Sequence, residues 1–229
     1  MIRPLYLSQA RLDRSRPATA LAQVLDPFEH DQAVDVHHRL IWTLFADDPG
    51  RKRDFLWRND DGQFLILSER HPEDRHALFE LRTKLFEPHL GRDDRLGFRL
   101  RANAVVTRAV DGRRHGKRHD IVMDLLRRKE TDASETERAL VRRASIAEAA
   151  RHWLSGQGAR YGFDLETLDS SLYRTVRLQR RSGVDGKLGV LDLDGVLRVS
   201  DPESLLAAVA NGFGKGKAFG CGLMLLRRA

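Results

Sequence analysis

Hydrophobic and polar positions repeat with the short period of a β-strand in several parts of the first half of the chain. Apolar residues there alternate with polar ones, as expected for a strand that buries one face. The strand-like runs cover residues 4–12, 53–58, 63–68 and 95–109. Residues 59–62 (NDDG) have the composition of a hairpin turn, so the second and third runs are predicted to form a hairpin.

Two segments of the same half show helical spacing instead. Asp26 and Pro27 are typical of a helix start, and apolar residues follow at helical intervals up to about Phe45. Residues 73–86 show a weaker helical pattern. The first half therefore predicts strands and helices in the order β-α-β-β-α-β.

The second half repeats this order. Residues 136–154, rich in Ala, Glu and Arg, predict a helix, and residues 172–181 and 187–193 predict a second hairpin. Asp201 and Pro202 predict the start of a short helix that runs to Ala210. A final strand is expected at residues 222–226.

Two β-α-β-β-α-β units in succession predict an α+β protein made of tandem ferredoxin-like domains. We place the domains at residues 1–95 and 96–229. The charge distribution separates the same two halves. The first has 15 Lys and Arg against 17 Asp and Glu, a net of −2, and the second has 25 against 16, a net of +9. An arginine-rich second half favours phosphate as a ligand, and so indicates nucleic acid.

Cysteine content and hydropathy limit the cellular setting. The 229-residue chain has a single cysteine, Cys221, so it can form no internal disulfide, as expected in a reducing cytoplasm. No segment has the length and hydrophobicity of a signal peptide or of a membrane span. We expect a cytoplasmic protein with no membrane partner.

Residues 211–222 (NGFGKGKAFGCG) combine five glycines with Lys215 and Lys217. Glycine allows positive φ and close approach of the backbone, so such a loop can present N–H groups to a phosphate. The loop follows a helix and Lys217 precedes Ala218, which disfavours a Walker loop, a dinucleotide site and therefore a nucleotide-binding enzyme. Some of these glycines are equally expected to serve packing between domains.

The glycine-rich loop resembles the C-terminal loop of the repeat-associated RNA-binding proteins of CRISPR systems (RAMP proteins), and its last residues resemble the CasE branch. Further matching segments occur in the same order and cover nearly the whole chain. They are residues 1–7, Arg53-Asp54-Phe55-Leu56, Phe98-Arg99-Leu100-Arg101-Ala102-Asn103, the hairpin from Gly186 to Leu197, and Gly220-Cys221-Gly222-Leu223.

The resemblance implies tandem ferredoxin-like domains of the RAMP type and cleavage of CRISPR repeat RNA at the base of its stem-loop. It also implies that the product stays bound and that the protein joins the other subunits of the Cascade complex. In this branch the catalytic histidine stands four residues before a Trp-x-Leu-Phe segment. Trp42-Thr43-Leu44-Phe45 places that histidine at His38.

His38 and its neighbour His37 differ in their place on the helix. On a helical wheel His37 falls within the apolar arc, as expected for a core histidine, whereas His38 falls at its edge. Many relatives have a tyrosine three residues before the catalytic histidine, where this chain has Asp35. A histidine can take the proton of a ribose 2′-OH without a metal, which leaves a 2′,3′-cyclic phosphate.

Basic residues expected to contact the RNA backbone lie on a strand, a basic run, a hairpin and the glycine-rich loop. They are Arg99, Arg101, Arg113, Arg114, Lys117, Arg118, Arg174, Arg177, Lys187, Lys215 and Lys217. The run 113–118 is equally well explained as a charged loop. For the pairs at 127–128 and 142–143 we favour a solvated helix face.

We expect no cofactor and no metal. His115 and His119 have the spacing of helical metal ligands, but the glycine and charges between them favour a loop. The main alternative to a nuclease is an RNA-binding subunit of the same fold that does not cut, and the missing tyrosine favours it.

Overall fold

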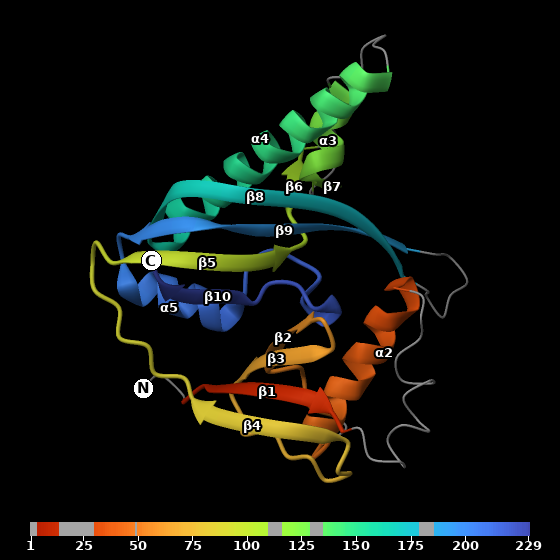
Figure 1. Cartoon of the computed structure of the whole chain (residues 1–229), viewed down its shortest axis with the longest axis vertical. Helices are drawn as coiled ribbons and strands as arrows, with labels where there is room; N and C mark the ends of the chain where they lie inside the picture. Colours follow the sequence, from red (N-terminus) through yellow and green to blue (C-terminus); the bar gives the residue numbers. More distant parts are fainter. Residues whose placement is uncertain (1–3, 14–29, 49, 110–115, 129–134, 179–185) are drawn as a thin grey trace.

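The computed structural model describes residues 4–13, 30–48, 50–109, 116–128, 135–178 and 186–229. The predicted helix start at Asp26 and Pro27 lies outside these ranges. Within them, strands gather into two four-stranded antiparallel sheets, one from each half of the chain, with a two-stranded sheet beside the second (Figure 1).

The first sheet has the strand order of a ferredoxin-like unit. It contains β1 (Tyr6–Leu12), β2 (Phe55–Asp60), β3 (Gln63–Ser68) and β4 (Phe79–Leu85), in the order β2-β3-β1-β4. Helix α2 (His30–Trp42) and the 3-10 turn η1 (Thr43–Phe45) connect β1 to β2. Leu40, Ile41 and Leu44 bury the apolar side of this connection in one core with Trp57 and Phe64.

The β2–β3 hairpin confirms the predicted turn. Its two connecting residues, Asp61 and Gly62, have φ values of 52° and 80°, as required by the tight turn that matches strand twist. The side chain of Asn59 accepts a 2.9 Å hydrogen bond from the N–H of Gly62, which closes the turn.

The predicted helix at residues 73–86 is wrong. Residues 79–85 form strand β4, which pairs with β1 along the whole length of both strands. Unpaired, β1 would leave a row of backbone groups exposed at the edge of the sheet, and β4 satisfies them while Phe79 packs on Phe64. Residues 69–78 contain no helix, so the second helix of this unit is missing.

The second sheet has the same order with both helices present. It contains β5 (Arg95–Ala102), β8 (Phe163–Leu178), β9 (Gly186–Val199) and β10 (Met224–Arg228), in the order β10-β5-β9-β8. Helices α4 (Glu135–Tyr161) and α5 (Pro202–Asn211) complete the β-α-β-β-α-β unit. As predicted, Asp201 caps α5, accepting hydrogen bonds from the N–H groups of Glu203 and Ser204.

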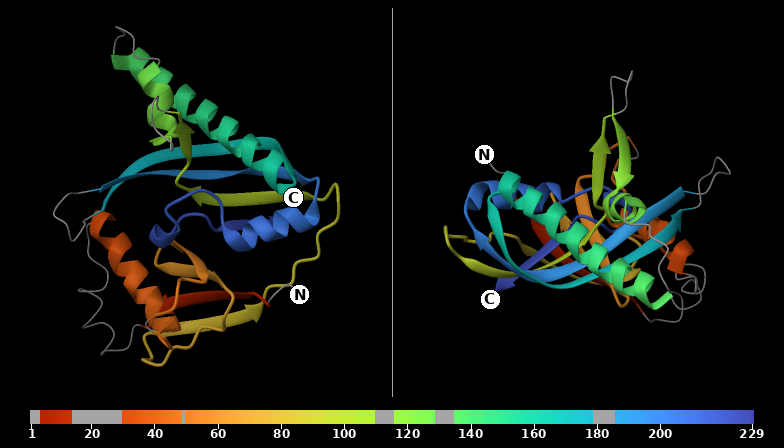
Figure 2. Two further views of the ribbon diagram at one scale, coloured as in Figure 1. Left: turned by 180° about the vertical axis from the view of Figure 1, so that it is seen from behind. Right: turned by 90° about the horizontal axis from the view of Figure 1, so that it is seen from above.

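An insertion separates β5 from α4. The single strand predicted at 95–109 breaks at Asn103, whose side chain donates a 2.8 Å hydrogen bond to the carbonyl of Gly189. The insertion contains the hairpin strands β6 (Val105–Arg108) and β7 (Lys117–Asp120) and the helix α3 (Ile121–Arg128). Together with the start of α4 it projects beyond the second sheet (Figures 1 and 2).

Besides the core under α2, one hydrophobic cluster contains residues of both halves. Leu56 and Leu67, on the face of the first sheet opposite α2, pack in the same cluster as Phe98 and Leu100 of β5. Gly212 also reaches the first sheet, because a Cβ there would lie 2.8 Å from the side chain of Leu56. The glycine-rich loop thus lies where the halves meet. Among the described helices, none is both long and apolar enough to cross a membrane.

Candidate active site

A pocket of about 500 Å³ lies at the junction of the two halves. It is lined by His38 of α2, by Arg53 just before β2, and by residues 214–219 of the glycine-rich loop. Three segments far apart in the sequence therefore meet there, and the loop contributes both Lys215 and Lys217. One imidazole and three cationic side chains face the same space.

Backbone geometry explains why the loop needs glycine. Gly214 has φ of 72°, and a Cβ there would lie 2.7 Å from the carbonyl oxygen of Asn103. Next to it, the N–H of Lys215 donates a 3.0 Å hydrogen bond to that same carbonyl. The loop is thus fastened to the end of β5, with its lysines held at the pocket.

His38 is half-buried and lines the pocket. The indole N–H of Trp42, one turn later on α2, donates a 3.1 Å hydrogen bond to Nε2 of His38. Only an unprotonated Nε2 can accept this bond, so it selects the neutral ring with its proton on Nδ1. The Nδ1 atom is inaccessible to solvent, which leaves Nε2 as the nitrogen available for chemistry in the pocket.

His37 is a core residue, as predicted. Only 8% of it is exposed, and its ring stands edge-on to those of Trp57 and Phe64. Its Nδ1 accepts a 3.3 Å hydrogen bond from the amide of Asn59. The backbone of Asp35 belongs to α2, but its side chain lies outside the described part of the structure.

Arg53 is a pocket residue that the sequence did not single out. Its guanidinium is half-buried, and its Nη1 has no hydrogen-bond partner among the described residues. Burial lowers the pKa of Arg53, because a charge is less well solvated there than in water. A partly desolvated guanidinium with unused donors is suited to a phosphate. In the sequence, the one feature that could have pointed to Arg53 was its place in the Arg53-Asp54-Phe55-Leu56 segment of the family resemblance.

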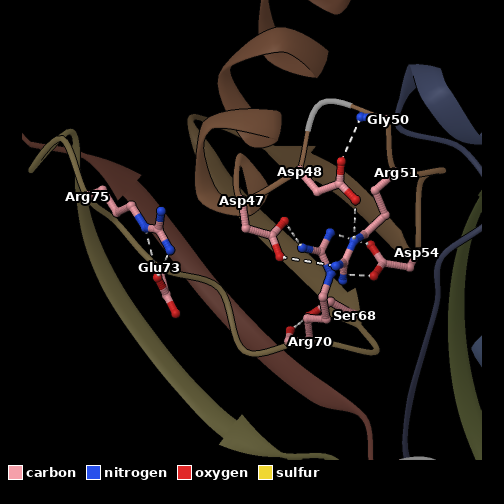
Figure 3. Close-up of polar contacts among 9 residues, drawn as sticks. All are labelled: Asp47, Asp48, Gly50, Arg51, Asp54, Ser68, Arg70, Glu73 and Arg75. Carbon is pink, nitrogen blue, oxygen red and sulfur yellow. Dashed lines mark hydrogen bonds and ion pairs between the residues drawn. The ribbon is translucent and has the colours of Figure 1, made fainter.

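The segment that carries Arg53 is held in place by Arg70, which follows β3 (Figure 3). Arg70 donates from Nε and Nη2 to both carboxylate oxygens of Asp54, at 2.5 and 2.9 Å, and from Nη1 to Asp47. These carboxylates raise the pKa of Arg70, and the guanidinium in turn lowers that of Asp47. Arg70 therefore fixes the loop between α2 and β2 at both ends.

The two lysines of the loop differ in their surroundings. Burial, followed by the charges of Arg53 and Lys215, lowers the pKa of Lys217. Its ammonium donates a hydrogen bond to the carbonyl of Asn211. A crowded, partly desolvated ammonium gives up a proton more readily than an exposed one and gains most from a bound anion.

The β8–β9 hairpin lies beside the pocket loop. Val176 and Leu188 pack with Cys221 and against Phe219, on the side of the hairpin that faces the loop. Arg177 and Lys187 are exposed and pair across the two strands. Arg174 is 43% exposed and donates a 2.8 Å hydrogen bond to Asp192. These predicted RNA contacts are therefore accessible.

The other predicted RNA contacts are dispersed. Arg99 is exposed on β5, and Lys117 and Arg118 are exposed on β7. Arg101 is only 19% exposed and is already bonded within the protein. Arg113, Arg114 and His115 lie outside the described residues. Among the residues that are described, no group of three or more His, Cys, Asp or Glu side chains is placed to hold a metal.

The strand orders and the pocket between the sheets define a tandem ferredoxin-like protein with a cationic site at the junction of its halves. The sequence profile of a family described as "CRISPR associated protein" matches residues 5–228. The chain therefore belongs to this family of CRISPR-associated proteins.

One relative agrees with this assignment, and two solved structures share the fold. The chain is 28% identical over 199 residues to the CRISPR system Cascade subunit CasE of Escherichia coli (strain K12), covering 82% of this chain and 89% of that protein. A Thermus thermophilus Cse3 bound to an RNA representing a pre-cleavage complex superposes with a TM-score of 0.64, at 22% identity over 98% of this chain and 99% of that one. Cas6e from E. coli K-12 gives 0.59, at 22% identity over 98% and 100%.

Proposed function

We propose that this protein is an endoribonuclease that cuts the stem-loops of CRISPR repeat RNA at the pocket between its two halves. The observation that carries the proposal is the meeting of His38 with Arg53, Lys215 and Lys217 in one pocket. A base beside three cations can supply the proton acceptor, the proton donor and the positive charge that cleavage through the 2′-OH uses. Family membership and the similarity to endoribonuclease Cse3 and to the Cascade subunit CasE support the same activity.

In the proposed reaction, Nε2 of His38 takes the proton of the ribose 2′-OH. The 2′-oxygen forms a bond to the adjacent phosphorus, and the bond from phosphorus to the 5′-oxygen of the next nucleotide breaks. Arg53 and Lys215 stabilise the charge that develops on the phosphoryl oxygens. Lys217 gives a proton to the leaving 5′-oxygen, leaving a 2′,3′-cyclic phosphate. No step requires a metal ion.

Basic side chains outside the pocket would hold the stem. Arg177 and Lys187 lie on one face of the hairpin beside the pocket loop and Arg174 on the other, and each is exposed enough to contact a phosphate. We propose in addition that the cut RNA stays bound, and the relative named as a Cascade subunit supports assembly with other Cascade subunits. The division at residue 95 assigns α2 with His38 to the first domain and the basic hairpin and glycine-rich loop to the second.

A non-catalytic RNA-binding subunit is the second candidate, and one observation favours it. Nε2 of His38 already accepts a hydrogen bond from Trp42, so RNA must displace the indole before the ring can act as a base. In unliganded sites, catalytic hydrogen bonds are often not yet in their working arrangement. The two candidates differ in whether RNA is cut at all.

Cleavage of a labelled repeat stem-loop, taken from the CRISPR array of the host, tests the proposal. In excess EDTA the protein should cut the RNA at one position, and His38→Ala should slow the step by about 10²- to 10⁴-fold. His152→Ala, an exposed histidine on α4, is the matched control and should cut at the original rate. RNA binding without cleavage by the unaltered protein would favour the second candidate.

A further inference from the structure

Arg101 occupies the point where β5, the glycine-rich loop and the first sheet meet. Its Nη1 donates a 2.9 Å hydrogen bond to the carbonyl of Asn59, at the end of β2 in the first sheet. Its Nε donates a 2.6 Å hydrogen bond to Asp192 on β9 of the second sheet. One guanidinium therefore bridges the two halves.

Neighbouring hydrogen bonds and ion pairs extend this bridge. The backbone carbonyl of Arg101 accepts a 2.7 Å hydrogen bond from the N–H of Gly222, which ends the glycine-rich loop. Asp60 lies 3.9 Å from the Arg101 guanidinium and 2.8 Å from that of the buried Arg58. The planar fork of arginine suits such simultaneous contacts, which a lysine ammonium on a single stem cannot reproduce.

Asn59 extends the bridge to helix α2. Its carbonyl accepts from Arg101, while its side-chain amide donates to Nδ1 of His37. His37 is the residue before His38, and its ring is fixed by Trp57 and Phe64. A continuous set of hydrogen bonds thus runs from Asp192 through Arg101 and Asn59 to the helix that carries the candidate catalytic histidine.

Arg99, on the same strand, differs from Arg101 in being accessible to RNA. It lies two residues earlier on the same face of β5 and is exposed, whereas Arg101 is 19% exposed with two donors already used. If Arg101 moved to bind a phosphate, it would lose its hydrogen bond to the Asp192 carboxylate and its hydrogen bond to the carbonyl of Asn59.

We infer that Arg101 is a positioning residue: it fastens the Asn59–Gly62 turn to the second sheet and so sets the place of α2 and His38 opposite the glycine-rich loop. It does not bind RNA phosphate. This replaces its expected role as an RNA contact, and it rests on the proposed function only for its effect on cleavage.

Arg101→Gln and Arg101→Lys separate the two roles. If Arg101 positions α2, both variants should bind repeat RNA with an affinity within twofold of the original and with the same salt dependence. Both should cut saturating RNA at least tenfold more slowly in single-turnover reactions. If Arg101 binds phosphate, Arg101→Gln should weaken binding and reduce the salt slope by about 1, and Arg101→Lys should largely restore both. That second pattern would overturn the inference, as would unchanged cleavage.

Two further variants keep the test sharp. Asn59→Ala removes the link to His37 and the turn-closing bond from Gly62, but it keeps the backbone carbonyl that Arg101 uses. It should reproduce the slow cleavage with unchanged affinity; full activity would overturn the inference. Arg95→Gln is the control, because Arg95 is an exposed residue of the same strand that pairs with Glu166 and takes no part in the bridge. It should leave cleavage unchanged.

The ¹⁵N NMR spectrum of the histidine side chains in the RNA-free protein tests the bridge independently of cleavage activity. In Arg101→Gln the ¹⁵N signal of His37 Nδ1 should shift, because the turn that carries Asn59 is released, and Arg95→Gln should leave it in place. If the signal shifts in Arg101→Gln but the unaltered protein cuts no RNA, the bridge is supported and the proposed function is contradicted. An unshifted signal in Arg101→Gln would sink the bridge itself.

Discussion

The indole of Trp42 donates a 3.1 Å hydrogen bond to Nε2 of His38, the nitrogen proposed to take the 2′-OH proton. The bond selects the neutral ring but occupies the lone pair that the reaction needs. Trp42 also packs edge-on against Phe55, so its ring belongs partly to the core of the first sheet. In the free protein, His38 is therefore neutral, and its Nε2 is hydrogen-bonded to Trp42.

Trp42→Phe should free this nitrogen while keeping an aromatic ring against Phe55. Displacing one hydrogen bond costs roughly 1 kcal/mol, so the cleavage step at saturating RNA should become about fivefold faster. Single-turnover kinetics measures the change. A fall of tenfold or more with unchanged RNA affinity would instead show that the indole holds the imidazole in its working orientation.

Lys217 should contribute a proton as well as a charge. Lys217→Arg keeps the positive charge but supplies a group that does not deprotonate, so RNA affinity should stay within threefold while single-turnover cleavage falls by about 10²-fold. Lys217→Ala should lose affinity too. Lys215→Ala is the comparison, with the larger effect expected on affinity. Equal cleavage by Lys217→Arg and the original protein would remove Lys217 as the acid.

Arg70 should stabilise the fold through its grip on the segment before β2 (Figure 3). Its side chain is 20% exposed and that of its partner Asp54 is 18% exposed. Arg70→Met should therefore lower the free energy of unfolding by about 2 kcal/mol, since it removes charge-assisted hydrogen bonds from partly buried groups. Urea unfolding provides the measurement.

Arg75→Met is the matched control for Arg70→Met. Arg75 pairs with Glu73, but the two side chains are 57% and 61% exposed. Such surface pairs contribute less than about 1 kcal/mol, so this variant should unfold close to the original protein. If both variants lost the same stability, the network around Arg70 would have no special role in holding the segment.

Asp120 should make stability depend on pH. Burial raises the pKa of Asp120 above its ordinary value of 3.8, although the N–H groups of Val122 and Met123 and the hydroxyl of Tyr173 oppose the shift. Between 3.8 and the raised pKa the folded protein binds more protons than the unfolded chain at this residue. Its contribution to stability therefore falls as pH rises through that window.

Asp120→Asn removes this titration but keeps an oxygen to accept from the two backbone N–H groups. The variant should melt at a higher temperature than the original protein at neutral pH, and the difference should shrink as pH falls toward 3.8. Thermal melts across a pH series measure it. A variant that melts lower at every pH would show that the carboxylate is worth more as a charged cap of α3 than its burial costs.

Local signals in the sequence predicted much of the fold. The β2–β3 hairpin follows from a turn whose residues accept positive φ, and α5 from an Asp-Pro start, because both depend on neighbouring residues alone. Strand β4 was missed since its conformation is set by the open edge of β1, about seventy residues earlier in the chain. Periodicity carries no information about such a distant partner.

The candidate site was predicted in part: local patterns located some of its residues, and the others are placed by tertiary packing. His37 and His38 could be separated because a helical wheel gives the direction of each side chain. The lysines of the glycine-rich loop were also found, through composition. Arg53 was missed, because its place at the pocket depends on how the two halves pack. Alternation placed Arg101 on the same face of β5 as Arg99, but it could not show that the carbonyl of Asn59 accepts a hydrogen bond from Arg101.

The mass of the RNA end left by the protein tests the central claim most directly. If His38 activates the 2′-OH, the upstream fragment made in excess EDTA must end in a 2′,3′-cyclic phosphate, and a 2′-deoxy nucleotide at the scissile position must prevent the cut. An upstream fragment with a free 3′-OH, or cleavage that continues past the deoxy nucleotide, would contradict the account.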